Sequence, residues 1–209
     1  GAVRALRPAW LAHRPGPGQM SQTPNLWAMF ALGLALAFLA GQGMSLLAYE
    51  WIGSPGFEQT QQLRREAGTT LVLVLSLVGA PLGEEALFRG LIYPLLRRRV
   101  GIWVAVLFTA LTFALLHGNI VQIAATWPMA VLMALVYERT RRLAATVAGP
   151  LVFNLAALVV PAHLMAMLVN PVGTLLTVAA FLACAWLVYT PVTRRPQATS
   201  GAPAVDRGD

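Results

Sequence analysis

Charged residues are scarce in this chain, and lysine is absent from it altogether. Of its 209 residues, 11% are charged and 57% are hydrophobic, and the mean hydropathy is +0.66. In soluble domains about a quarter of all residues are usually charged. The scarcity of charge therefore excludes an ordinary soluble domain and predicts an integral membrane protein, whose length suits one compact bundle.

Cysteine is nearly absent as well, because Cys184 is the one cysteine and no intrachain disulfide can form. Residues 1–19 are rich in arginine and proline and contain no apolar run of the kind found in signal peptides, so we expect no cleavable signal. The net charge of +7 suggests a nucleic-acid partner at first sight, but the arginines form short clusters between apolar runs, without a basic helix or an interleaved aromatic face. We therefore expect no nucleic-acid binding.

Apolar segments close to the ~20 residues that a spanning helix needs recur along the chain. They cover residues 25–49, 69–96, 101–117, 120–137, 144–166 and 172–190. The pattern predicts an all-α, polytopic membrane protein with about six transmembrane helices in one bundle. We divide the chain into a cytoplasmic N-terminal segment (1–24), the helix bundle (25–190) and a polar C-terminal tail (191–209), which its composition predicts to be disordered. The loop at 50–68 is expected to contain an amphipathic helix at the membrane surface.

The arginine clusters predict the orientation of this bundle. With six spans, twelve arginines fall on one side of the membrane, namely Arg4, Arg7, Arg14, Arg97, Arg98, Arg99, Arg139, Arg141, Arg142, Arg194, Arg195 and Arg207. The excess of positive charge places that side in the cytoplasm. Only Arg64 and Arg65 face the other side. We therefore expect an integral protein of a bacterial plasma (inner) membrane, with both termini in the cytoplasm.

Two adjacent glutamates and an arginine interrupt the second apolar segment. Each such group costs at least ~2.5–3.5 kcal/mol to insert, so ionisable residues inside a membrane indicate a functional site by default. Glu85 and Arg89 are four residues apart with the acid first, which is the favourable order for an ion pair within one helix. Glu84 points about 100° away from Glu85 and has no such partner. Glu84 is therefore a candidate general base, and a polar network that merely joins helices is the alternative.

A histidine and an asparagine are candidate partners of Glu84. Glu84 lies thirteen residues before the turn at 97–100, and His117 lies seventeen residues after it. At ~1.5 Å per residue both lie roughly 20–25 Å from that turn, so they can meet at one level, nearer the outer face of the membrane. Asn154 lies inside the fifth apolar segment. An amide there either joins the site or forms a bond across helices worth ~0.6 to 2 kcal/mol.

The segments EEALFR (84–89) and FALLH (113–117) have the forms EExxxR and FxxxH. Together they resemble the CPBP intramembrane glutamic proteases, the family that includes the type II CAAX prenyl endopeptidases, over about residues 69–160. The resemblance implies that Glu84 activates the attacking water, that Glu85 and Arg89 order the site, and that His117 assists beside the water. Asn154 matches the asparagine of the family's HxxxN motif, whose polar side chains stabilise the oxyanion.

Pro150 occupies the histidine position of that HxxxN motif. His163 lies nine residues beyond Asn154, which is ~13 Å along a helix and too far for a simple replacement. Zinc sites usually take three protein ligands, whereas the matched residues offer one imidazole and no thiolate. We therefore expect no cofactor and no metal, and a hydrolysis of the metal-free, glutamate type.

These residues predict an intramembrane endopeptidase that cleaves a membrane-anchored or exported protein near its hydrophobic segment, for example a C-terminal sorting segment. Its partners would be that protein substrate and the lipid bilayer. Three alternatives stay open at this point. The first is a metal-dependent protease at the same residues. The second is a non-catalytic binding or immunity factor with a degenerate site, which Pro150 favours. The third is a small transporter with a proton relay, which the lack of repeated broken helices disfavours.

Overall fold

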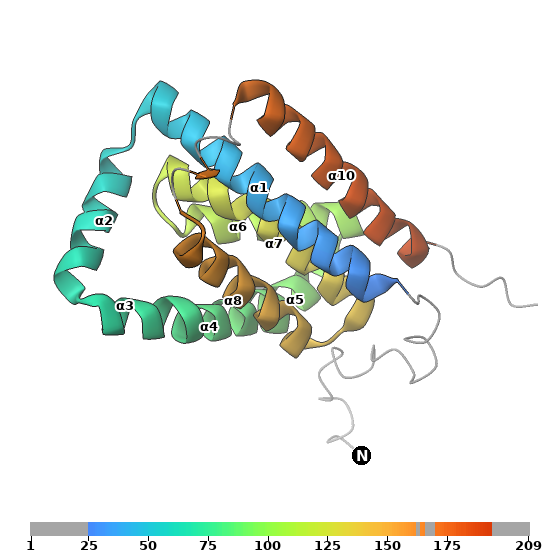
Figure 1. Ribbon diagram of the computed structural model, residues 1–209. Helices are drawn as coiled ribbons and strands as arrows, with labels where there is room; N and C mark the ends of the chain where they lie inside the picture. The colour runs from blue at the N-terminus through green and yellow to red at the C-terminus, as the bar shows by residue number, and fades with distance from the viewer. Residues whose placement is uncertain (1–24, 162–163, 166–169, 194–209) are drawn as a thin grey trace, which may run out of the picture.

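The computed structural model describes residues 25–161, 164–165 and 170–193, and each secondary-structure element among them is a helix (Figure 1). The all-α prediction is therefore confirmed. The predicted N-terminal segment (1–24), residues 194–209 of the predicted tail, and His163 lie outside the described residues.

The first helix, α1, covers Leu26–Ile52, and α2 covers Pro55–Ala67. One continuous helix then follows, composed of α3 (Thr69–Val74), η3 (Leu75–Gly79), α4 (Ala80–Leu87), η4 (Phe88–Ile92) and α5 (Tyr93–Arg97). The remaining helices are α6 (Ile102–Leu115), α7 (Ile120–Thr140), α8 (Leu143–Val159) and α10 (Pro171–Thr193). Each of the six predicted apolar segments thus contains a helix.

The predicted count of six spanning helices is not confirmed. Within the described residues, four helices are long and apolar enough to cross a membrane: Leu26–Ile52, Thr70–Arg97, Ile120–Thr140 and Pro171–Thr190. The helices α6 and α8 are shorter. The first ends before Gly118, whose φ of 74° reverses the chain into α7. The second ends before Val160, which is extended ahead of Pro161 because a residue that precedes proline avoids the helical region.

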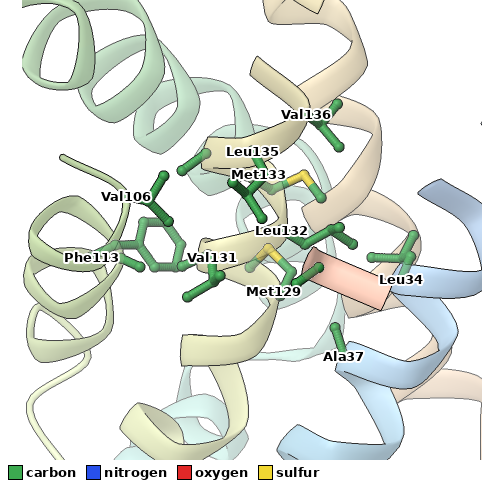
Figure 2. Packing of buried hydrophobic residues seen from close by; sticks show 14 of the residues in the cluster. Leu34, Ala37, Val106, Phe113, Met129, Val131, Leu132, Met133, Leu135 and Val136 are labelled. Atoms are coloured by element: carbon green, nitrogen blue, oxygen red, sulfur yellow. The ribbon is translucent and has the colours of Figure 1, made fainter. Parts of the chain in front are cut away.

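The helix α7 occupies the centre of the bundle and packs against α1, α6, α8 and α10. Figure 2 shows its apolar side chains, among them Leu132 and Met133, between Phe113 of α6 and Leu34 of α1. A helix that is apolar on all sides is expected to be buried in this way. The backbones of α1 and α7 approach closely at Gly41, where an added Cβ atom would collide with the carbonyl oxygen of Ala125.

The C-terminal ends of α5, α7 and α10 lie together at one end of the bundle, and arginines of α5 and of the end of α7 form the contacts there. Glu138 of α7 accepts hydrogen bonds from Arg97 Nε of α5 at 3.2 Å and from Arg141 Nη2 at 2.7 Å. Arg139 Nη1 donates to the carbonyl oxygen of Val188 in α10 at 2.8 Å. This arrangement agrees with arginine clusters on one side of a membrane. Their assignment to the cytoplasm stays a prediction.

A helix does occupy the loop at 50–68. The Ser54 side chain accepts a hydrogen bond from the Phe57 N–H at 3.2 Å and so caps α2. Gly53 and Gly68 flank the helix with φ values of 69° and 81°, a region that favours glycine. The helix α2 contacts α3 and α7, and Figure 1 shows it at the end of the bundle away from the C-terminal end of α10.

A proline explains each π-helical segment in the long helix. In an α-helix the proline ring collides with the carbonyl four residues earlier, and a π turn relieves that collision. Here the Ala80 N–H donates to the carbonyl of Leu75, five residues back. The next residue, Pro81, has no N–H, so the carbonyl of Ser76 is left without a main-chain donor. The segment η4 shows the same arrangement ahead of Pro94.

Candidate active site

A cavity of about 390 Å³ lies among the long helix, α2, α6, α7 and α8. Three of the five predicted site residues line it, namely Glu84 from α4, His117 from the turn after α6, and Asn154 from α8. Pro150, at the position of the motif histidine, lines it as well. The volume falls within the range of about 300–1,000 Å³ that is usual for ligand pockets. The structure therefore brings together residues that the sequence separates widely.

The carboxylate of Glu84 is half-buried at this cavity. No hydrogen bond or ion pair to its side chain is present in the part of the chain that the structure describes. Its neighbour Glu85 faces a different side of α4 and is fully buried. The 100° between adjacent helical positions thus gives the two glutamates different surroundings. Glu84 is available to water or substrate, whereas Glu85 is engaged within the protein.

The predicted ion pair between Glu85 and Arg89 is confirmed. Arg89 Nη1 and Glu85 Oε1 are 2.5 Å apart, and both side chains are 0% exposed. Arg89 Nη2 also donates to the carbonyl oxygen of Ala130 in α7 at 2.6 Å, and its guanidinium lies 5.2 Å from the centre of the Phe113 ring in α6. The pair does not line the cavity. It joins the helix that carries Glu84 to two neighbouring helices.

The imidazole of His117 is oriented by its own helix. His117 Nδ1 lies 3.2 Å from the carbonyl oxygen of Phe113. A carbonyl can only accept, so Nδ1 carries the proton, and in the neutral ring the lone pair is on Nε2. The ring also contacts that of Phe113, with centroids 5.4 Å apart. His117 is half-buried at the cavity. Its Nε2 is therefore suited to accept a hydrogen bond from a water molecule.

The amide of Asn154 forms a bond across helices. Asn154 Nδ2 donates to the carbonyl oxygen of Ser76 at 2.8 Å. This is the carbonyl that Pro81 leaves without a main-chain donor. A buried carbonyl without a partner is costly, so this bond stabilises the proline-containing turn. One N–H of the amide is committed to that bond, and the second N–H remains for another acceptor at the cavity.

Several polar residues at the cavity were not among the residues predicted from the sequence. They include Thr60 and Arg64 of α2 and Gln122 of α7. Gln122 gives a weak signal, since it is a lone amide in an apolar run. Arg64 gives none, because its place at the cavity depends on how α2 folds back on the bundle. Within the described residues, no group of three or more His, Cys, Asp or Glu is placed to hold a metal ion.

Four of the described helices are long and apolar enough to cross a membrane, which indicates an integral membrane protein. Residues 66–156 match the family model described as type II CAAX prenyl endopeptidase Rce1-like, and this range contains all five predicted site residues. This match confirms the family resemblance predicted from EExxxR and FxxxH. The family supports a membrane endopeptidase-type function on a protein substrate. Comparisons with curated proteins and with solved structures gave no match.

Proposed function

We propose that the chain is an intramembrane endopeptidase in which Glu84 activates water. The observation that carries the proposal is the convergence of Glu84, His117 and Asn154 on one cavity. The buried Glu85–Arg89 pair supports it, because the pair holds the helix of Glu84 against its neighbours. The five residues thus divide into three that face the cavity and two that position the first of them.

In the proposed reaction a water molecule lies between the Glu84 carboxylate and His117 Nε2. The carboxylate takes one proton while the water oxygen bonds to the carbonyl carbon of the substrate, whose oxygen becomes negatively charged. The carbon–nitrogen bond then breaks, and Glu84 returns the proton to the leaving amine. The second N–H of Asn154 donates to the oxyanion, a contribution of about 10²–10³ in rate in other hydrolases.

The walls of the cavity favour an apolar substrate segment. Leu73, Leu77 and Phe113 line it beside the polar residues. The long helix also exposes leucine and valine side chains over most of its length, as a lipid-facing surface would. A membrane-anchored or exported protein, cut near its hydrophobic segment, fits these surroundings. A C-terminal sorting segment is one such substrate.

The rival function is a non-catalytic binding or immunity factor. Two observations favour it: Pro150 cannot donate a hydrogen bond from its side chain, and one N–H of Asn154 is engaged with Ser76. In that case the cavity would bind a protein segment without cleaving it. The two functions differ in whether new protein termini appear.

The deciding experiment compares protein C-termini by mass spectrometry in cells that express the wild type, Glu84→Gln or no protein. Glu66→Gln is the matched control, because Glu66 is exposed on α2 and is not among the residues that line the cavity. We expect new termini with the wild type and with Glu66→Gln, and none with Glu84→Gln. Equal cleavage by Glu84→Gln would refute the general-base role. New termini in none of the cells would favour the binding factor.

A further inference from the structure

We infer that Gln122 is a further catalytic residue, whose Nε2 group donates a hydrogen bond to the substrate carbonyl oxygen as it becomes negatively charged. The inference rests on the proposed endopeptidase function. It assigns to Gln122 the task that the family's motif gives to a histidine and that Pro150 cannot perform. Gln122 and Pro150 line the same cavity as Glu84 and His117.

A chain of hydrogen bonds identifies which atom of the Gln122 side-chain amide is the oxygen, Oε1, and which is the nitrogen, Nε2. The Gln122 main-chain N–H donates to Asn119 at 2.9 Å, so the accepting atom is Asn119 Oδ1. The other atom of that amide is therefore Nδ2, which lies 2.6 Å from the Gln122 side chain and 3.2 Å from the His117 carbonyl. Because Nδ2 can only donate, the Gln122 atom that it contacts is Oε1. The remaining atom, Nε2, carries two N–H groups.

No hydrogen bond from Nε2 is found among the residues that the structure describes. Asn119 itself is 7% exposed and caps α7, so the amide of Gln122 is held by a buried side chain that is itself hydrogen-bonded in the turn. Donors that are oriented in advance are the ones that stabilise a developing oxyanion, because they need no reorganisation during the reaction. Gln122 Nε2 meets this requirement.

The other neutral donors at the cavity are less suited to the task. The hydroxyl of Thr126 donates to the Gln122 carbonyl at 2.8 Å, and that of Thr60 donates to the Gly56 carbonyl at 2.8 Å, so each has used its single proton. Asn154 has one N–H left, which the proposed function already assigns to the same oxyanion, so Gln122 would be the second donor beside it. Ser76 also lines the cavity, but no partner within the described residues orients its hydroxyl. Ser76 is therefore the rival donor that the experiment must test.

The test uses the purified full-length protein in detergent and a synthetic peptide that spans a cleavage site found by the comparison of C-termini. Gln122→Glu keeps the oxygen that accepts from Asn119 but removes the N–H donors. Gln122→Met is neutral and of similar length, and it removes both the accepting oxygen and the N–H donors. We expect each variant to lower kcat by about 10²–10³ with KM changed by less than about threefold. Ser76→Ala and Thr126→Val should each lower kcat by much less than either Gln122 variant.

A purely structural role for Gln122 predicts a different pattern. Gln122→Glu would then remain active because it preserves the bond from Asn119, while Gln122→Met would lose activity and thermal stability together. This structural pattern would overturn the inference. So would a wild-type kcat in either Gln122 variant, or a loss of activity in Ser76→Ala alone. If the wild type cleaves the peptide, Glu84→Gln does not, and the Gln122 variants match the wild type, only this inference fails. Equal cleavage by the wild type and Glu84→Gln would remove the proposed function and the inference together.

Discussion

Replacing Arg89 with alanine tests the buried ion pair most directly. The side chain is 0% exposed, pairs with Glu85, and donates to the Ala130 carbonyl at 2.6 Å. The variant leaves the Glu85 carboxylate buried without a cation, a change that typically costs ~3–5 kcal/mol. If ~1 kcal/mol lowers the melting temperature by ~2–4 °C in a chain of this size, the expected decrease is ~6–20 °C. We expect activity to fall as well, because Glu84 lies on the same helix.

The sole cysteine supplies the assay. Cys184 is buried at 5% exposure, so a thiol-reactive fluorophore reports its exposure when the protein unfolds in detergent. Arg97→Ala is the matched control. Arg97 is 30% exposed, and in the variant its partner Glu138 would still be paired with Arg141, whose Nη2 lies 2.7 Å from Glu138 Oε2. A partly exposed pair of this kind contributes only about 0–1 kcal/mol, so the melting temperature should change little.

A second variant distinguishes two causes of the lost stability, namely the unpaired buried charge of Glu85 and the lost packing of the Arg89 side chain. The double change of Glu85→Leu and Arg89→Met removes both charges and keeps most of the side-chain volume. Replacing a buried pair with apolar residues is often neutral or stabilising. The double variant should therefore be more stable than Arg89→Ala alone. An Arg89→Ala protein with the melting temperature of the wild type would refute the reasoning about stability. If that stable protein were also inactive, the pair would serve catalysis rather than architecture.

Two further predictions concern orientation and metal. Reporter fusions after Arg99 and after Arg142 should report the cytoplasm, and a fusion within 50–68 should report the opposite side, because the arginine clusters follow the positive-inside rule. Reversed signals would overturn the topology. Prolonged chelation of the purified protein should leave most of its activity, because Pro150 removes the second histidine that a zinc site would use. Activity that is lost on chelation and restored by zinc or cobalt would instead favour metal-dependent hydrolysis, with His163 as the next ligand to test.

Much of the fold could be predicted because hydropathy and helical periodicity are local properties. A run of apolar residues must satisfy its backbone within itself in a bilayer, so each run predicts a helix, and each predicted run contains one. The i,i+4 spacing of Glu85 and Arg89 likewise predicts their pairing, because both side chains belong to one helix. The level shared by Glu84 and His117 followed from the rise per residue on either side of a short turn.

The lengths of α6 and α8 could not be predicted from hydropathy. An apolar residue has the same hydropathy whether it lies inside or outside a helix. Helix ends depend instead on backbone geometry, as at Gly118 and before Pro161. The number of segments that are long enough to span a membrane therefore differed from the prediction.

The sequence by itself determined the membrane class, the helical segments, the family motifs and the ion pair, since each depends on residues that are close along the chain. Tertiary structure alone decided the remaining contacts between polar groups of different helices. The bond from Asn154 to Ser76 depends on a proline in one helix and an amide in another. The place of Gln122 at the cavity depends on how α7 packs against α6 and α8, which line the cavity together with the helix of Glu84. Contacts between helices are selected by the packing of whole surfaces, which no short window of sequence contains.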